Sequence, residues 1–219
     1  MADTSHNLEH IDPRLPDPGI IRRAANILEE GGIVVFPTTG LYGLAADALN
    51  PRAVDAIFNL KQRPAHNPLL VLIKDRSVLP QVVSHIPEAA NPLMDLFWPG
   101  HLTLVMNGHG KLPPALTGGT GRIGVRVSAH PVARALVQAF DRPITGTSAN
   151  ISGRPGCSEI ACLAPDIRSK ADLILDAGTL KGGKGSTVID VTRHPVHVIR
   201  EGHIQIDTLK PYLERDFTK

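Results

Sequence analysis

The chain has 219 residues, 42% of them hydrophobic and 20% charged, which fits a soluble globular protein with one domain as the better expectation. Its net charge of +2 gives little support for a polyanionic partner, and 4% aromatic residues are too few to indicate a stacking platform for single-stranded nucleic acid. No stretch approaches the roughly eighteen apolar residues of a membrane span, and the N-terminus has no apolar core typical of a signal peptide.

The start of the chain is predicted to form a polar arm and then a helix. Residues 1–18 are polar and contain three prolines, so we expect an extended N-terminal arm on the surface and a single domain over residues 19–219. Apolar residues recur at helical spacing from Ile20 to Glu30, and the glycine pair that follows ends this amphipathic helix.

A strand, a helix and a second strand are predicted over the next forty or so residues. The apolar run Ile33 to Phe36 indicates a short buried strand that a proline ends. Asn50 and Pro51 have the character of an N-cap and a first helical position, and Pro64 ends the helix that they begin. Leu69 to Ile73 is again apolar throughout. Together these segments predict a βαβ-like unit.

Polar and basic groups lie at the turns of this unit. Thr38, Thr39 and Gly40 follow the first strand, and Lys61 and Arg63 fall in the last turn of the helix. The hydroxyls can belong to an ordinary loop, and cations in a last turn stabilise the helix dipole by roughly 0.3–1 kcal/mol. Taken alone, these residues leave a structural and a functional role open.

The remaining elements alternate between helices and strands, which predicts the α/β class with a twisted mixed sheet and flanking helices. Helices are expected over 77–84, 92–97, 131–140 and 206–213, strands over 101–107, 122–127, 143–146, 172–176, 187–191 and 196–200, and a loop over 108–121. The strand from Arg122 to Val127 places Arg122 and Arg126 on one face. Two arginines are costly to bury unpaired, so they are either solvated or face an anion.

Several familiar motifs are excluded. The loop from Gly178 to Gly185 nearly matches a P-loop, but glycine replaces the final hydroxyl residue and a strand, not a helix, follows. The neighbouring histidines, His194 and His197, have no metal-binding spacing, and Ser148 is not in a GxSxG elbow. The two cysteines, residues 157 and 162, match neither a CxxC motif nor a zinc pair, so a reducing cytosol is the expected compartment.

Seven short blocks in a fixed order connect the chain to a known family. They read FPTTGLYGL, KQRP, NPL, WPGHLT, IGVRV, TSAN and STVID, and they extend over the range from about Ile20 to Gly202. Each block alone is weak, but in this order they resemble the YrdC family, the threonylcarbamoyl-AMP synthases. The chain resembles the short form of that family, which has a single catalytic domain.

The resemblance implies a fold and a reaction. The fold would be one YrdC-like α/β domain whose twisted mixed sheet surrounds a large basic cavity. The reaction would join L-threonine, bicarbonate and ATP, with Mg2+ accompanying the ATP, to give threonylcarbamoyl-adenylate and pyrophosphate. A partner transferase would then move the threonylcarbamoyl group to the adenosine beside the anticodon of certain tRNAs, in the cytoplasm.

The resemblance also assigns site residues. The catalytic pair would be Lys61 and Arg63. The ATP-binding group would be Arg63, Asn67, Asn150, Ser158 and Arg200. The threonine-binding group would be Thr38, Arg126, Ser148 and Ser186. A guanidinium suits a carboxylate bidentately, which fits Arg126. No protein metal ligand and no covalent nucleophile is expected. The threonine amine would capture CO2, and the resulting carbamate would attack the α-phosphate.

Two positions depart from the family pattern. Gly40 stands where many members carry a hydroxyl residue, and Leu72 stands where some long members have a histidine. Both changes remove hydrogen bonds from the amino-acid side, which keeps a paralogue using another amino acid as an alternative. A further alternative is an RNA-binding protein of the same fold that acts on tRNA or in ribosome maturation through backbone contacts.

Overall fold

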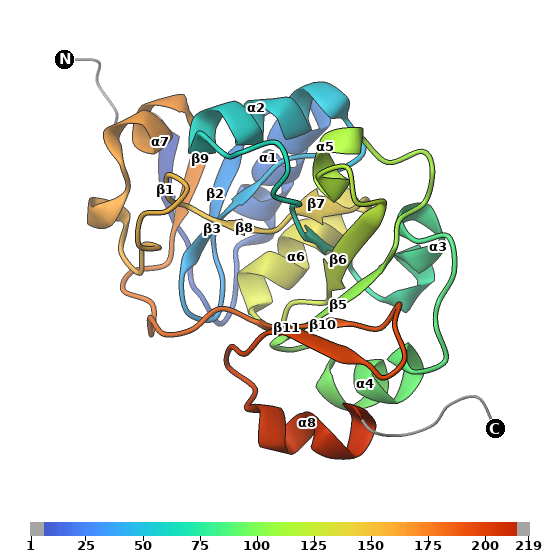
Figure 1. Ribbon diagram of the computed structural model, residues 1–219. Coiled ribbons are helices and arrows are strands. Elements are labelled where there is room, and N and C mark those ends of the chain that lie inside the picture. Colours follow the sequence, from blue (N-terminus) through green and yellow to red (C-terminus); the bar gives the residue numbers. More distant parts are fainter. Residues whose placement is uncertain (1–6, 214–219) are drawn as a thin grey trace.

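The computed structural model describes residues 7–213 and confirms the α/β class, with two mixed sheets flanked by helices (Figure 1). In order across the first sheet lie β1 (Leu8–His10), β9 (Leu173–Asp176), β2 (Val34–Pro37), β3 (Tyr42–Ala45) and β8 (Thr147–Ser148). In order across the second lie β11 (His197–Arg200), β10 (Thr187–Asp190), β5 (Leu102–Asn107), β6 (Arg122–Arg126), β4 (Val71–Leu72) and β7 (Ile144–Thr145). We call them sheet A and sheet B.

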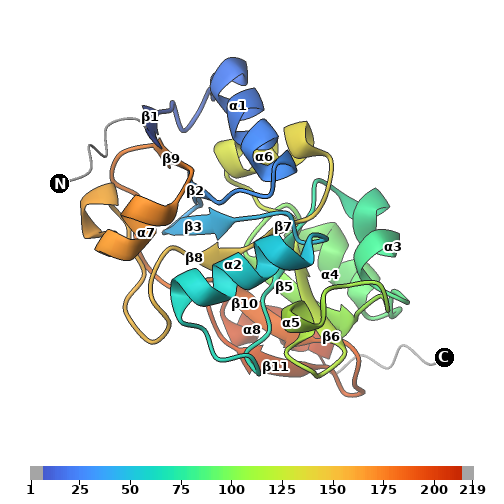
Figure 2. The same cartoon turned by 90° about the horizontal axis from the view of Figure 1, so that it is seen from above.

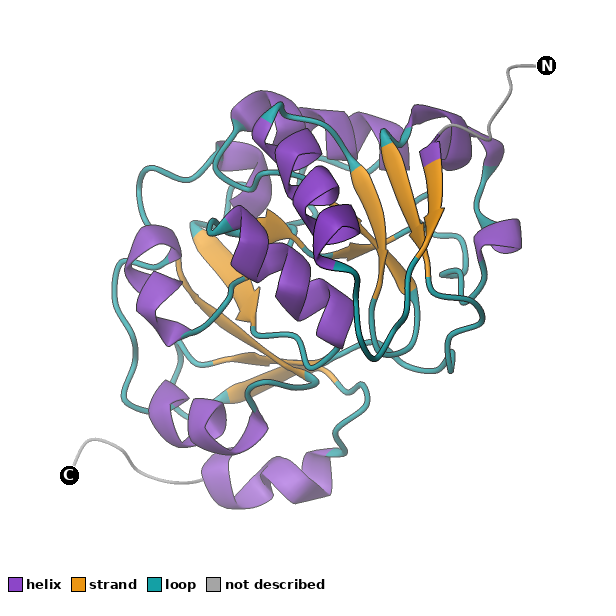
Figure 3. Cartoon of the chain, turned by 180° about the vertical axis from the view of Figure 1, so that it is seen from behind, coloured by secondary structure: helices purple, strands orange, loops and turns teal. Residues whose placement is uncertain are grey.

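Helices cover the outside of both sheets, as Figure 3 shows from behind. They are α1 (Pro18–Glu29), α2 (Pro51–Lys61), α3 (Leu79–Val82), α4 (Ala90–Phe97), α5 (Pro114–Thr117), α6 (Pro131–Phe140), α7 (Pro165–Lys170) and α8 (Ile206–Leu213), with 3₁₀ turns at Arg76–Val78 and Ile160–Cys162. Helices α1 and α6 lie side by side (Figure 2) and bury Leu28 and Leu136 completely. Two apolar cores result, one between these helices and sheet A and one around α2 and sheet B.

Helix α2 begins at the predicted Pro51, and α1 begins at Pro18, two residues before the predicted Ile20. Asp17 caps α1, its carboxylate accepting from the backbone nitrogens of Gly19 at 2.7 Å and Ile20 at 3.0 Å. Asn50 caps α2 in the same way, accepting from the nitrogen of Arg52 at 3.0 Å, with Pro51 as the first helical residue. These caps fix where α2 starts and therefore where its last turn delivers Lys61.

The predicted βαβ-like unit is wrong in its pairing. Its two strands, β2 and β4, belong to different sheets. The chain instead turns back after β2 to form β3, a four-residue strand that sequence analysis missed. Strand β3 pairs antiparallel with β2. The strand β4 pairs with β6 and β7 in sheet B. The predicted loop over 108–121 likewise contains α5, and α7 was not predicted.

The expected N-terminal arm makes sheet contacts in its described part. Residues 8–10 form β1, which pairs in parallel with β9, and Ile11 behind it is buried. Asn7 donates from Nδ2 to the carbonyl oxygen of Ala171 at 2.8 Å. Residues 1–6 of the predicted arm lie outside the described residues.

Candidate active site

A cavity of about 900 Å³ lies over one face of sheet B. Alternate residues of a strand point to the same face, and each of three adjacent strands contributes such a set. The cavity floor is formed by His101, Thr103 and Val105 before and in β5, Arg122, Gly124 and Arg126 in β6, and Ser186, Val188 and Asp190 before and in β10. The loop after β2, strand β8 and residues 181–185 complete the walls.

The lining of this cavity is strongly basic. Its lysines and arginines are Arg63, Arg122, Arg126, Lys181, Lys184, Arg193 and Arg200, whereas Asp190 is the one acidic residue among the described lining residues. The cavity therefore favours anions, although the net charge of the chain is only +2. The basic cavity that the resemblance implied is confirmed.

Arg126 is the most unusual of these cations. Its Nε is buried and has no hydrogen-bond partner within residues 7–213, and no ion pair to its guanidinium occurs there. Burial, together with the nearby Arg200, lowers the pKa of Arg126 to about 10. A guanidinium whose Nε is buried and unpaired, and which has no acidic partner, is unfavourable. Its most economical explanation is an anionic ligand that it faces in the cavity.

Hydroxyl groups surround the same end of the floor. Ser186 is buried and its Oγ lies 2.8 Å from Oγ1 of Thr103. Ser148 lines the cavity from β8 and donates from Oγ to Oδ1 of Asn150. Thr38, also in the lining, donates from Oγ1 to the carbonyl of Leu41 at 2.6 Å. The predicted threonine-binding residues therefore all line one cavity.

Arg63 reaches the cavity from the end of α2. Its Nε donates to the carbonyl oxygen of Asn67 at 3.1 Å and its Nη2 to that of Pro68 at 2.8 Å. These two bonds fix the plane of the guanidinium, and burial lowers the pKa of Arg63 below its usual range. Asn67 is not in the lining, and it contributes a backbone carbonyl that orients Arg63.

Lys61 and Asn150 lie behind the cavity wall, outside the lining. Lys61 is 1% exposed, and its Nζ donates to the carbonyl oxygens of Ser148 at 2.5 Å and Asn150 at 2.7 Å. The amide of Asn150 donates to the carbonyls of Ile151 at 2.9 Å and Arg154 at 2.6 Å. Both side chains thus shape the loop that presents Ser148.

Replacing Lys61 with methionine should destabilise the fold by about 2 kcal/mol, because two partly buried carbonyls lose their donor. Burial and the positive charge of Arg63 lower the pKa of Lys61 from 10.5 to about 7. Between pH 7 and about pH 10 the unfolded chain then binds more protons than the folded one, so stability rises with pH. Urea unfolding at pH 7 and 9 should show this rise in the parent and a smaller one in Lys61→Met.

The other two predicted nucleotide contacts differ in placement. Arg200 lines the cavity from β11 and donates from Nη2 to the carbonyl of Ser186 at 2.8 Å. Ser158 lies outside the lining, and its carbonyl accepts from the backbone nitrogen of Leu180 at 2.8 Å. Six predicted residues therefore meet in the cavity, namely Thr38, Arg63, Arg126, Ser148, Ser186 and Arg200, whereas Lys61, Asn67, Asn150 and Ser158 surround it.

Sequence reasoning missed several lining residues. Asp190 could have been found, because strand alternation places it on the same face as Ser186. His101 and His203 could not, since they are distant in sequence, yet their rings stack with centroids 4.0 Å apart. Burial, His203 and Arg126 lower the pKa of His101, which favours its neutral form near pH 7.

The loop of residues 181–185 before β10 forms one wall of the cavity. It also explains why residue 40 is a glycine. Gly182 donates its backbone N–H to the carbonyl of Gly40 at 2.9 Å, and a Cβ at Gly40 would lie 2.5 Å from the carbonyl oxygen of Gly182. Gly182 and Gly183 have φ values of +69° and +95°, which favour glycine. The loop leads into strand β10 and not into a helix, which agrees with its exclusion as a P-loop.

Restoring a hydroxyl at this position, by Gly40→Ser, should therefore loosen the loop instead of adding a useful hydrogen bond. The new Cβ meets backbone, which cannot rotate away as a side chain would. We expect trypsin to cleave after Lys181 or Lys184 several times faster than in the parent, measured by mass spectrometry of the fragments. Gly110→Ser is the matched control, because nothing lies within 4 Å of its Cβ position. Unchanged cleavage in Gly40→Ser would contradict the expectation.

Residues 7–213 carry no sign of a metal cluster or of a membrane-spanning helix. This part of the chain contains no group of three or more His, Cys, Asp or Glu side chains able to hold a metal ion. None of its helices has the length and apolar character to cross a membrane.

Comparisons with known proteins fit this arrangement. The sequence model of the Sua5/YciO/YrdC family, described as telomere recombination, matches residues 26–202. A threonylcarbamoyl-AMP synthase of Pyrococcus abyssi is 41% identical over 190 residues, which cover 87% of this chain and 56% of that protein. One of Chromobacterium violaceum is 32% identical over 179 residues, which cover 82% of this chain and 92% of that protein.

A solved structure is similar over nearly the whole chain. The crystal structure of P. abyssi Sua5 complexed with L-threonine has a TM-score of 0.89 and 38% identity, over 94% of this chain and 60% of that one. The chain spans 56% to 58% of the length of several curated relatives that it matches, little more than half.

Proposed function

Because the chain belongs to the Sua5/YciO/YrdC family, we propose that it is a nucleotidyltransferase that forms threonylcarbamoyl-adenylate and pyrophosphate from L-threonine, bicarbonate and ATP. The observation that supports this most is the guanidinium of Arg126, whose Nε is buried and which has no acidic partner within the described residues. It lies at the end of the cavity floor where Ser186 and Thr103 present hydroxyls. A threonine carboxylate supplies the missing charge, and the hydroxyls suit its polar atoms.

The threonine site then consists of Arg126, with the hydroxyl side chains of Thr38, Ser148 and Ser186 around it. Arg63 and Arg200 are cations of the cavity that bind ATP on the side of its α-phosphate. The remaining predicted ATP residues, Lys61, Asn67, Asn150 and Ser158, act through the backbone that they hold, as their hydrogen bonds indicate. Lys61 is thus a positioning residue in this proposal.

The chemistry needs no covalent nucleophile from the protein. Bicarbonate releases CO2 and hydroxide. The threonine amine forms a bond to the CO2 carbon, and its proton joins the hydroxide as water, giving a carbamate. A carbamate oxygen then forms a bond to the α-phosphorus of ATP, while the bond from that phosphorus to the bridging oxygen breaks and its electron pair leaves with pyrophosphate. The protein contributes orientation and neutralisation of the phosphate charge, mainly through Arg63.

Magnesium would accompany ATP. In the described lining the one carboxylate, Asp190, is already bound by Arg122 and Arg193. Magnesium binds readily through substrate phosphates, so the residues present fit an ion held by the nucleotide more than by the protein. The downstream partners in this proposal are a threonylcarbamoyl transferase and tRNA in the cytoplasm.

The test is pyrophosphate release from ATP, magnesium and bicarbonate, with and without L-threonine and again with L-serine. Release that requires threonine is the expected result. Release with another amino acid would indicate a paralogue, with Gly40 and Leu72 in the lining as the first suspects. A folded, ATP-binding protein that releases none would contradict the synthase and favour the RNA-binding alternative.

A further inference from the structure

Two arginines share one buried carboxylate at the far end of the cavity floor. Arg122 donates from Nη1 to Oδ2 of Asp190 at 2.7 Å, and Arg193 lies with Nε 3.3 Å from the same oxygen. The other carboxylate oxygen accepts from the nitrogen of Thr192 at 2.9 Å and from its hydroxyl. Both carboxylate oxygens of Asp190 therefore have partners. The cluster of Arg122, Arg193 and Asp190 keeps one excess positive charge.

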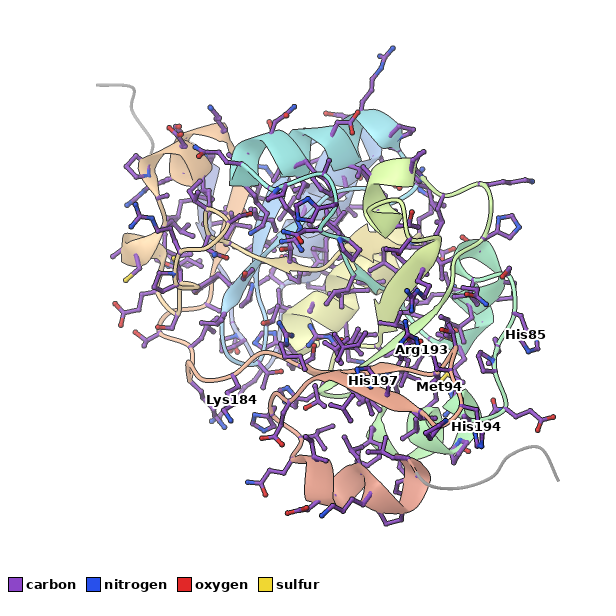
Figure 4. All side chains as sticks on the ribbon, viewed as in Figure 1. His85, Met94, Lys184, Arg193, His194 and His197 are labelled. Atoms are coloured by element: carbon purple, nitrogen blue, oxygen red, sulfur yellow. The ribbon has the colours of Figure 1, made fainter. Side chains whose placement is uncertain are left out.

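This cluster lies opposite the proposed threonine site. Arg122 and Arg126 are four residues apart on the same face of β6, a separation of about 13 Å along a strand. Asp190 and Ser186 have the same spacing along β10. Figure 4 shows Lys184 on the segment before β10, and Arg193 with His197 at the other end of that strand, where His197 pairs with Asp190. The floor thus has two basic ends.

The guanidinium groups retain donors for a ligand. Apart from the contacts to Asp190, neither Arg122 nor Arg193 makes a further side-chain hydrogen bond or ion pair within residues 7–213. Both side chains line the cavity, with 32% and 58% of their surface exposed. One arginine would suffice to neutralise Asp190, as Arg142 does for the buried Asp47 outside the cavity, at 2.9 Å. The second arginine is therefore not needed to neutralise the carboxylate of Asp190, and it must have another role.

The geometry of displacement at phosphorus indicates that role. The attacking and leaving oxygens of a phosphoryl-type transfer lie roughly in line, on opposite sides of the phosphorus. With the threonine carboxylate at Arg126, the carbamate attacks from that end, and the bond that breaks points toward Arg122. We propose that Arg122 and Arg193, positioned by Asp190, bind the β- and γ-phosphates of ATP and the pyrophosphate that departs.

This inference rests on the proposed function and assigns its leaving-group site. Pyrophosphate carries a dense negative charge, and bidentate guanidinium contacts are well suited to phosphate oxygens. The carboxylate of Asp190 orients both guanidiniums but does not cancel their combined charge. The opposite arrangement, in which the adenosine lies over Arg122 and the phosphates lie elsewhere, makes a different prediction for the binding of AMP.

The experiment compares Arg122→Gln and Arg193→Gln with the matched control Arg142→Gln. Calorimetry measures the dissociation constants of pyrophosphate alone, ATP and AMP for each protein, and urea unfolding measures stability. We expect each cavity variant to bind pyrophosphate and ATP about tenfold more weakly, as loss of one charge-assisted contact implies. AMP and L-threonine should bind as in the parent. Arg142→Gln should lose stability without any change in binding.

Three outcomes would overturn the proposal. Unchanged pyrophosphate affinity in both variants would leave the arginines as partners of Asp190 alone. A loss for AMP as large as that for ATP would place the adenosine, not the phosphates, at this end. A drop in affinity in Arg142→Gln equal to that in Arg122→Gln would attribute the effect to stability. A parent protein that binds no ATP would instead contradict the proposed function itself, so the two failures are distinguishable.

Discussion

Arg126→Met should give a protein that is more stable than the parent and no longer binds L-threonine. In the parent the Nε of Arg126 is buried and has no partner among the described residues, which costs about 1–3 kcal/mol. Methionine removes that cost while keeping most of the side-chain volume, so we expect a gain of about 1 kcal/mol in unfolding free energy. The affinity for threonine should fall about 100-fold, the equivalent of a charge-assisted bidentate pair.

Urea unfolding and calorimetric titration with L-threonine measure these two effects separately. Arg134→Met is the matched control, since this arginine is exposed on α6 and away from the cavity lining. It should change neither quantity much. A variant at position 126 that loses stability and still binds threonine would show that Arg126 supports the fold and not the ligand.

Arg63→Ala should lower threonine-dependent turnover by a factor of roughly 10² to 10³, the usual cost of removing one preorganised electrostatic contact. The fold should survive, because the carbonyls of Asn67 and Pro68 that lose their donor belong to partly or fully exposed residues, where water replaces it. Steady-state pyrophosphate release and circular dichroism test the two parts.

Arg63→Lys separates charge from geometry. Lysine keeps the positive charge but cannot donate to two carbonyls in a plane and still face the cavity. We expect it to recover only a small part of the lost turnover. Retained turnover in Arg63→Ala would remove this residue from the catalytic group, whatever the lysine variant shows.

Local patterns predicted the elements better than their partners. The caps at Asp17 and Asn50 depend on neighbouring residues, so α1 and α2 begin close to where they were predicted. The pairing of β2 with β3, and of β4 with β6, depends on contacts that no local pattern contains. Strand β3 has only four residues, one of them glycine, which is too short for a recognisable alternation.

The site residues show the same difference between what local patterns predict and what only the fold determines. Strand alternation alone put Arg122 and Arg126 on one face, and the structure shows that this face is the cavity floor. The resemblance supplied the remaining assignments, but not how each side chain is used. Only the fold shows that Lys61 donates its hydrogen bonds to backbone carbonyls. The same is true of the stacking of His101 on His203.

The pairing of β1 with β9 has a consequence for how the chain acquires its structure. The first described strand finds its partner across most of the chain, and the nearby bond from Asn7 to Ala171 joins residues 164 positions apart. Closing such a loop is entropically expensive before any contact rewards it, so high contact order slows folding. During synthesis β1 therefore stays without its partner strand until β9 has been made. Sheet A is therefore completed late, and the half-made chain carries an exposed strand edge in the meantime.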